Sequence, residues 1–213
     1  MISPLGDYGH CKTARFLPVI LSEFARVALE QPIVFVADHE LIVPIAVLGL
    51  GKEVNFFVDE KDQWTGRYIP AYARMYPFIL APRRDGNDYS VCIDEDYPGF
   101  NEQQGTKLFD STGSQSEFTQ NAVAFASEYQ REREQSLKFT ARIKQLGLLE
   151  QANFSFGDEE EASVGGFMTI NRSKLNGLSE TDLLGLFEQN ALELIYLQLA
   201  SLANFDYLAS LGK

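Results

Sequence analysis

The sequence predicts an α+β fold in which a strand-rich N-terminal part, a meander or barrel-like antiparallel sheet, packs with C-terminal helices and a small hairpin. Before residue 110, short apolar runs recur about every ten residues with turn residues between them, which is typical of antiparallel strands. After residue 110, apolar residues recur at helical spacing over long stretches. We therefore expect one domain over residues 1–213, strand-rich over about 1–110 and helical over about 111–213.

The first part is expected to contain one short helix and five strands. Ser22 has the residue type of an N-cap before apolar residues at helical spacing, and Pro32 would end that helix. Pro70 suits the first position of a helical turn, and the residue before Pro77 should be extended. The expected strands are residues 33–36, 45–48, 55–58, 78–80 and 89–93, with turns at 59–62 and 83–88.

The second part is expected to begin with a long helix over about residues 117–146, for which Gly147 is a stop signal. Its polar stretch, residues 131–135, is either a solvated turn of the helix or a break in it. Residues 154–156 and 166–170 could pair as a hairpin with the acidic residues 158–161 at its tip. Ser179 and Asp182 have the form of a capping box that opens a strongly apolar helical region. Such helices are more often buried, and a homodimer through them is the alternative.

The charge of the chain bears on its partners. The net charge is −12, and residues 1–110 and 111–213 each carry −6. A surface this acidic repels phosphate backbones and anionic lipid heads, so we expect no nucleic acid partner. The longest apolar stretch, residues 41–50, is interrupted by Pro44 and is too short for membrane insertion. The N-terminus lacks a secretory signal pattern, which predicts a cytoplasmic protein.

The best candidate for a ligand site is the aromatic and arginine-rich segment of residues 64–78. Its arginines could hold a carboxylate or phosphate bidentately, and its aromatic rings offer flat faces for a ring or a peptide. The alternative is that the rings fill a core and the arginines pair with the many carboxylates of the chain. The candidate ligand-binding residues are Trp64, Arg67, Tyr68, Tyr72, Arg74 and Tyr76.

Other patterns do not point to catalysis. The only histidines, His10 and His39, could recruit Cys11 or Asp38 to a metal, but none of them has metal-ligand spacing. The acidic runs at residues 94–96 and 159–161 lack the spacing of a calcium loop, and no phosphate-binding or nucleophile motif occurs. We therefore predict no metal, no cofactor and no catalytic residue.

Several segments, taken together and in order, resemble the bacterial SapC family. They are residues 23–24, 31–35, 48–50, 55–58, 64–78, 108–110, 146–150 and 199–204, and His10 stands where many members have an early histidine. Met75 departs from the pattern, because members often carry a second arginine there. The name resembles that of an unrelated peptide-transport permease, which the lack of transmembrane segments excludes.

The resemblance implies little chemistry. The family is associated by name with bacterial surface layers, and its members tend to be linked with genes for tryptophan-halogenase-like proteins and outer-membrane receptors. It carries no agreed activity or catalytic residues. Our hypothesis is a non-enzymatic accessory or binding protein that recognises a peptide, a protein or a small aromatic or acidic ligand. The alternatives are a surface-layer component and an enzyme acting on amino acids or peptides beside a halogenase-like partner.

Overall fold

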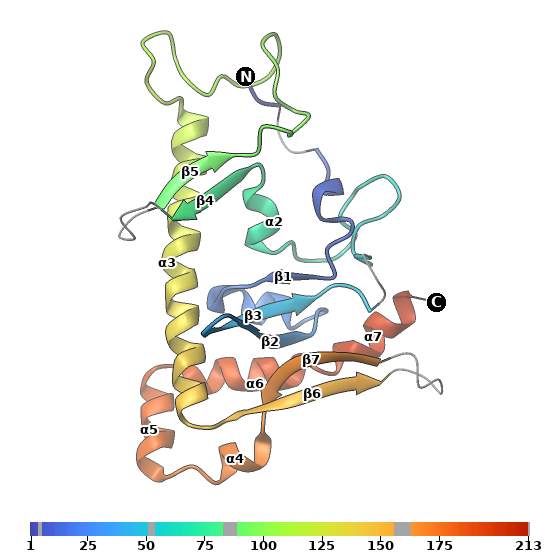
Figure 1. Cartoon of the computed structure of the whole chain (residues 1–213), viewed down its shortest axis with the longest axis vertical. Coiled ribbons are helices and arrows are strands. Elements are labelled where there is room, and N and C mark those ends of the chain that lie inside the picture. The colour runs from blue at the N-terminus through green and yellow to red at the C-terminus, as the bar shows by residue number, and fades with distance from the viewer. Residues whose placement is uncertain (4–5, 51–53, 83–88, 156–162, 213) are drawn as a thin grey trace.

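A computed structural model describes residues 1–3, 6–50, 54–82, 89–155 and 163–212 of the chain (Figure 1). The strands are β1 (Phe16–Pro18), β2 (Ile33–Asp38), β3 (Leu41–Val47), β4 (Phe78–Pro82), β5 (Tyr89–Ile93), β6 (Leu149–Ser155) and β7 (Ser163–Ile170). The helices are α1 (Phe24–Val27), α2 (Ala71–Met75), α3 (Glu117–Gln145), α4 (Arg172–Asn176), α5 (Glu180–Glu188), α6 (Ala191–Ser201) and α7 (Asn204–Leu211), with short 3-10 turns η1 (Gly9–Cys11) and η2 (Leu21–Glu23).

The main sheet joins the two parts of the chain. Its five antiparallel strands run in the order β1-β3-β2-β7-β6, so a strand of the first part pairs with a strand of the second, where Phe35 faces Met168. A separate two-stranded sheet pairs β4 with β5. The α+β prediction is confirmed. The main sheet has β1 and β6 as its edges and is open rather than closed into a barrel.

The central strand β2 is apolar on both faces because both faces are covered. Ile33, Val34 and Phe35 are all fully buried. Their side chains point alternately to opposite faces of the sheet, and both faces belong to packed apolar clusters. Helix α6 packs against β2, and α3 packs against β3. This uninterrupted apolar run is the reason why β2 could be predicted.

Helix α3 is the longest element and runs beside both sheets (Figure 1). The Ser116 hydroxyl accepts a hydrogen bond from the Thr119 amide at 3.3 Å and caps the helix, and Gly147 follows its end with φ of +67°. The polar stretch 131–135 is helical, so the helix is continuous. Thr140 ties it to the main sheet by donating to the Ile42 carbonyl at 2.7 Å.

Three local expectations were wrong. Residues 55–58 form no strand: residues 56–57 are a turn and Val58 makes only an isolated bridge to Trp64, because the Asn55 side chain bonds the Cys11 carbonyl and the Phe57 amide. Ser22 lies within the 3-10 turn η2 and does not cap α1. Pro70 is the N-cap of α2 rather than its first helical residue. Strand β1 was not predicted, and the expected turn at 83–88 and acidic tip at 158–161 lie outside the described residues.

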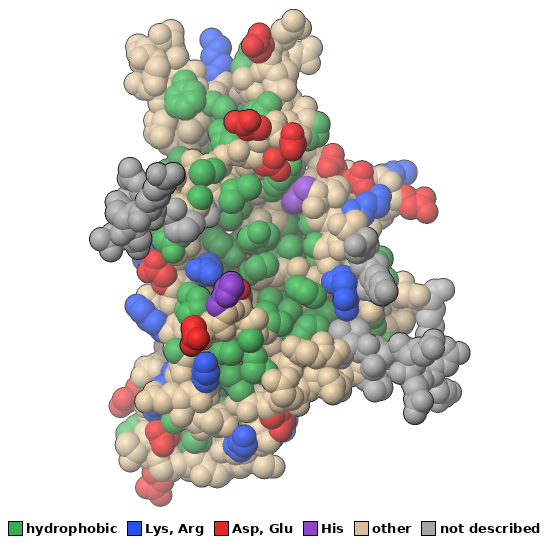
Figure 2. Space-filling view, viewed as in Figure 1, with side chains coloured by type: hydrophobic (Ala, Val, Ile, Leu, Met, Phe, Trp, Pro, Cys, Tyr) green, Lys and Arg blue, Asp and Glu red, His purple; other side chains and the backbone are tan. Residues whose placement is uncertain are grey.

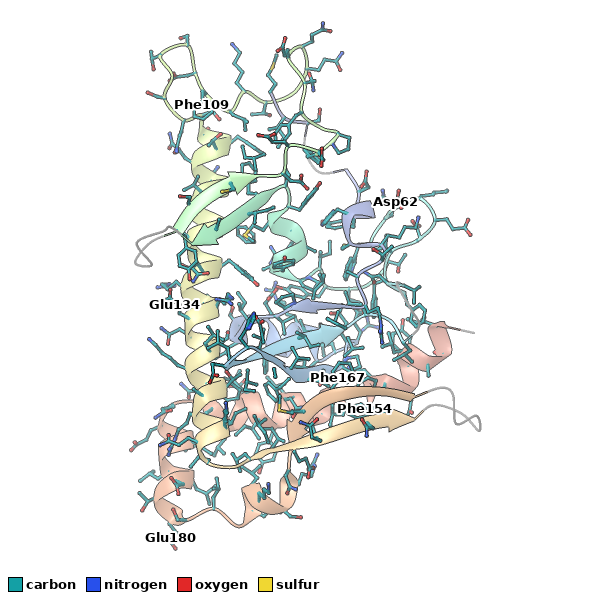
Figure 3. All side chains as sticks on the ribbon, in the orientation of Figure 1. Asp62, Phe109, Glu134, Phe154, Phe167 and Glu180 are labelled. Atoms are coloured by element: carbon teal, nitrogen blue, oxygen red, sulfur yellow. The ribbon has the colours of Figure 1, made fainter. Side chains whose placement is uncertain are left out.

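The C-terminal part supplies two strands of the main sheet and helices that pack against it. The predicted hairpin is confirmed as β6 and β7, on which Phe154 and Phe167 are labelled in Figure 3. Phe154 stacks on Phe205 of α7 with ring centroids 3.9 Å apart. The predicted cap at Ser179 is also confirmed, because its hydroxyl accepts from the Asp182 amide at 3.1 Å and opens α5.

Candidate functional site

Two buried glutamates hold the aromatic segment of residues 64–78 against η2 and α1. The Glu23 carboxylate accepts hydrogen bonds from the Tyr68 hydroxyl at 2.8 Å and from the Ala71 amide at 2.6 Å. The Glu30 carboxylate accepts from the amides of Arg67 at 2.5 Å and Tyr68 at 3.1 Å. A buried carboxylate is tolerated only when donors surround it, so these bonds fix the path of the segment.

Trp64 and Arg67 begin the segment in different settings. The Trp64 ring stacks on Phe57 with centroids 5.8 Å apart and meets the edge of the Tyr8 ring, so it contributes to packing. Arg67 is exposed, and its side chain has no ion pair with any residue that the structure describes. The structure does not bring these two side chains together with the rest of the predicted set.

Tyr68 and Arg74 form a linked pair. Arg74 donates from Nη2 to the Tyr68 hydroxyl at 3.2 Å and from Nε to the Ile69 carbonyl at 3.1 Å. The Tyr68 hydroxyl in turn donates to Glu23. Burial, followed by the charge of Glu23, raises the pKa of Tyr68 to about 12. Its hydroxyl is therefore neutral at physiological pH and stays a donor to the carboxylate.

Tyr72 and Tyr76 lie on a different side of α2, where they help to line a hollow. The Tyr76 ring stacks on His10 at 4.2 Å with only 9° between the ring planes. Tyr72 is 46% exposed and lies 6.3 Å from the Tyr129 ring. Both tyrosines line a hollow of about 200 Å³ whose other walls are largely apolar.

This hollow is one half of what we call the inter-sheet groove, which runs between β1 and the β4–β5 hairpin. A second hollow of about 420 Å³ continues it and shares Tyr72, Met75 and Ile79. Figure 2 shows hydrophobic side chains gathered in this depression. Leu17 and Pro18 of β1 line one wall and Phe78 and Ile79 of β4 the other, with Tyr72 and Met75 of α2 between them.

Two titratable side chains of the smaller hollow, His10 and Cys11, have pKa values shifted by burial. Burial raises the pKa of the Cys11 thiol to about 11, so little of the reactive thiolate forms near neutral pH. Burial also lowers the pKa of His10, although a hydrogen bond to the Ala73 backbone and the charge of Asp7 oppose this shift. Over the described ranges, no three histidine, cysteine or acidic side chains gather closely enough to hold a metal ion. The groove is suited to binding an apolar ligand.

Comparison with known proteins decides the family. The SapC family model matches residues 1–208, which is nearly the whole chain. The chain belongs to the SapC family. Neither the curated proteins nor the solved structures gave a match.

For this SapC-family chain, the described helices include none that is both long and apolar enough to cross a membrane. The sequence singled out the segment of residues 64–78 but not the residues on which it packs. No sequence pattern singles out Glu23, Arg26 and Glu30, because nothing local shows that a segment about 40 residues later packs on them. The available signal was the place of Glu23 and Arg26 on a short predicted helix with apolar neighbours.

Proposed function

We propose that this member of the SapC family is a non-enzymatic binding protein that takes up an extended, apolar peptide segment of a partner protein in the inter-sheet groove. The observation that carries the proposal is the pair of strand edges that form the walls of the groove. Strand β1 is the edge of the main sheet, and β4 lies on the β1 side of its hairpin (Figure 1).

The backbone of β4 supports this mode of binding. The Asp94 amide donates a hydrogen bond to the Pro77 carbonyl at 2.9 Å. This bond sets the hydrogen-bonding register between β4 and β5. Since main-chain groups alternate along an antiparallel pair, those of Phe78 and Leu80 point away from β5. A peptide that adds as a strand gains affinity by bonding to such free main-chain groups, and it gains specificity by placing alternate side chains in neighbouring hollows.

The side chains supply the second support. Tyr72 and Ile79 are each nearly half exposed, at 46% and 45%, although both are large and apolar. Adjacent exposed apolar residues beside a hollow are typical of interaction sites rather than of ordinary surface. The charged residues Asp38 and Arg133 lie only in the larger hollow, so an apolar segment with few charges fits best.

The experiment is a selection of random heptapeptides displayed on phage, with the purified chain as bait. We expect enrichment of sequences with alternating apolar residues, and loss of that enrichment with the double variant Tyr72→Ser/Ile79→Ser. Tyr207→Ser/Leu29→Ser is the matched control, because it removes an exposed tyrosine and an exposed aliphatic residue that line neither hollow of the groove. Equal enrichment with both double variants, or none with the wild type, would overturn the proposal.

We also propose a cytoplasmic location, which rests on the sequence alone. The surface-layer role and the enzymatic role beside a halogenase-like partner stay predictions, since no contact in the structure favours either. The high pKa of Cys11 argues against a cysteine nucleophile in the groove.

A further inference from the structure

A second hollow, which we call the arginine cleft, lies between η2–α1, α2 and α3 and has a volume of about 330 Å³. Helix α2 presents Ala71 and Arg74 to this cleft, whereas its Tyr72 and Met75 line the inter-sheet groove. Arg26 of α1 contributes the second cation of the cleft. The cleft therefore opens on another side of α2 and shares only Tyr129 with the hollows of the groove.

The two arginines converge on one ring. The guanidinium carbons of Arg26 and Arg74 lie 5.5 Å and 5.7 Å from the centroid of Tyr68. A cation against an aromatic face gains an electrostatic attraction that holds it in place. Arg74 is further fixed by its two hydrogen bonds and by the Phe125 ring, 5.2 Å from its guanidinium carbon.

Neither arginine is neutralised by an ion pair within the described ranges of this strongly acidic chain. The closest buried acid, Glu23, is occupied: it accepts from the Tyr68 hydroxyl and from the amides of Ala71 and Ile20. Glu23 orients the tyrosine between the two arginines instead of pairing with them. The cleft thus holds two positioned guanidiniums whose charge is available to a ligand.

The remaining walls decide which anion fits. Phe125 and Tyr129 give the cleft an apolar wall, and Glu128 and Glu132 stand one turn apart on α3 at its rim. Arg131 pairs with both glutamates, at 2.5 Å and 3.6 Å, and so offsets part of their charge. Coulomb repulsion grows with the charge of the ligand, so the remaining negative charge at the rim disfavours a dianion such as phosphate more than a monoanion. A guanidinium also matches the planar geometry of a carboxylate.

We propose that the arginine cleft binds the carboxylate of an organic monoanion with an apolar body, using Arg26 and Arg74 for the charge and Phe125 and Tyr129 for the body. Two sources share this chemistry, a free organic acid and the C-terminal carboxylate of a peptide.

The test uses ligand titrations of the full chain followed by NMR, with 3-phenylpropionate as the small acid and acetyl-Ala-Ala-Phe as the peptide acid. We expect saturable shifts with at least one acid and none with the corresponding amides. Arg26→Gln and Arg74→Gln should each weaken binding at least tenfold, which corresponds to about 1.4 kcal/mol. Arg26 is exposed and makes only the ring contact, so its variant is expected to keep the fold.

Arg67→Gln is the matched control, because Arg67 is an exposed arginine of the same segment that does not line the cleft. Tighter binding of the peptide acid would identify the source as a C-terminus, and tighter binding of the small acid would identify a free metabolite. Equal binding of acid and amide, an equal loss with Arg67→Gln, full competition by inorganic phosphate, or no saturable shift would each overturn the proposal. The Ile79→Ser variant should retain acid binding, because Ile79 lines the groove and not the cleft, which separates this test from that of the groove.

Discussion

The Tyr68 hydroxyl donates to the buried carboxylate of Glu23 at 2.8 Å and accepts from Arg74 at 3.2 Å. One tyrosine therefore links a carboxylate at the end of η2 to an arginine of α2. Through this link, the segment that carries the candidate binding residues is docked on the start of α1. The same link separates the inter-sheet groove from the arginine cleft, because it fixes which side of α2 faces each hollow.

The first prediction concerns Glu23→Gln. Glu23 is 3% exposed and its two carboxylate oxygens accept three donors, whereas a glutamine has one accepting oxygen and an NH₂ group that would face a donor. Leaving a buried donor unsatisfied costs about 1–3 kcal/mol, and we expect a loss of this size in the free energy of unfolding measured with urea. Glu40→Gln, at an exposed position, is the control. An unchanged unfolding midpoint for Glu23→Gln would contradict the role given to this carboxylate.

The second prediction concerns pH. Burial lowers the pKa of His10 below its ordinary value of 6.5, so the unfolded chain binds this proton more tightly than the folded chain. The stability that follows from this difference is present above pH 6.5 and is lost as the pH falls from 6.5 through the folded-state pKa. His10→Gln should therefore flatten the unfolding free energy over this pH window.

Because the chain has only two histidines, NMR titration of their ring protons gives the pKa of His10 directly, with His39→Gln for assignment. A measured pKa at or above 6.5 would refute the prediction.

The third prediction concerns Gly66→Ala. A Cβ at this position would lie 2.8 Å from both Glu30 Oε1 and Phe57 Cδ1 and 2.9 Å from Trp64 Nε1. Relief of such crowding shifts packed neighbours at a cost of about 1–3 kcal/mol, which thermal unfolding would report as a lower Tm. Gly6→Ala is the matched control, since its Cβ would meet nothing within 4 Å. Equal Tm values for the two variants would show that the segment is less tightly packed than described.

The fourth prediction is a homodimer through the C-terminal helices, for which Leu184 and Phe187 of α5 are 56% and 67% exposed. Light scattering on a size-exclusion column should give twice the chain mass, and Phe187→Ser should give the monomer mass. Phe109→Ser is the control, because Phe109 is also exposed but lies at the opposite end of α3 (Figure 3). A wild type that stays monomeric at all concentrations would rule out the dimer.

Elements fixed by local signals could be predicted from the sequence. Helix α3 has a capping serine, apolar residues at helical spacing and Gly147 after its end. The hairpin β6–β7 and the start of α5 at Ser179 likewise depend on residues close in the chain. The choice of residues 64–78 as the candidate binding segment also came from local composition.

Elements that depend on partners distant in the chain could not be predicted from the sequence. Residues 55–58 have the composition of a strand, but Asn55 turns the chain by bonding the Cys11 carbonyl 44 residues away. Strand β1 is only three residues long and exists because β3 pairs with it. In the core, Gln198 of α6 donates to the Ile33 carbonyl at 2.9 Å and to the Thr169 hydroxyl at 3.0 Å, which ties the helix to both parts of the main sheet.

The sequence by itself determined the α+β class, the family and the segment that carries the candidate residues, since periodicity, capping and motif order are encoded over short stretches. Only the tertiary structure decided that Tyr72 and Tyr76 face a groove while Tyr68 and Arg74 face a cleft with Arg26. The physical reason is that a short helix can present its faces to either surface, and the docking of Tyr68 and Ala71 on the buried Glu23 carboxylate selects one rotation.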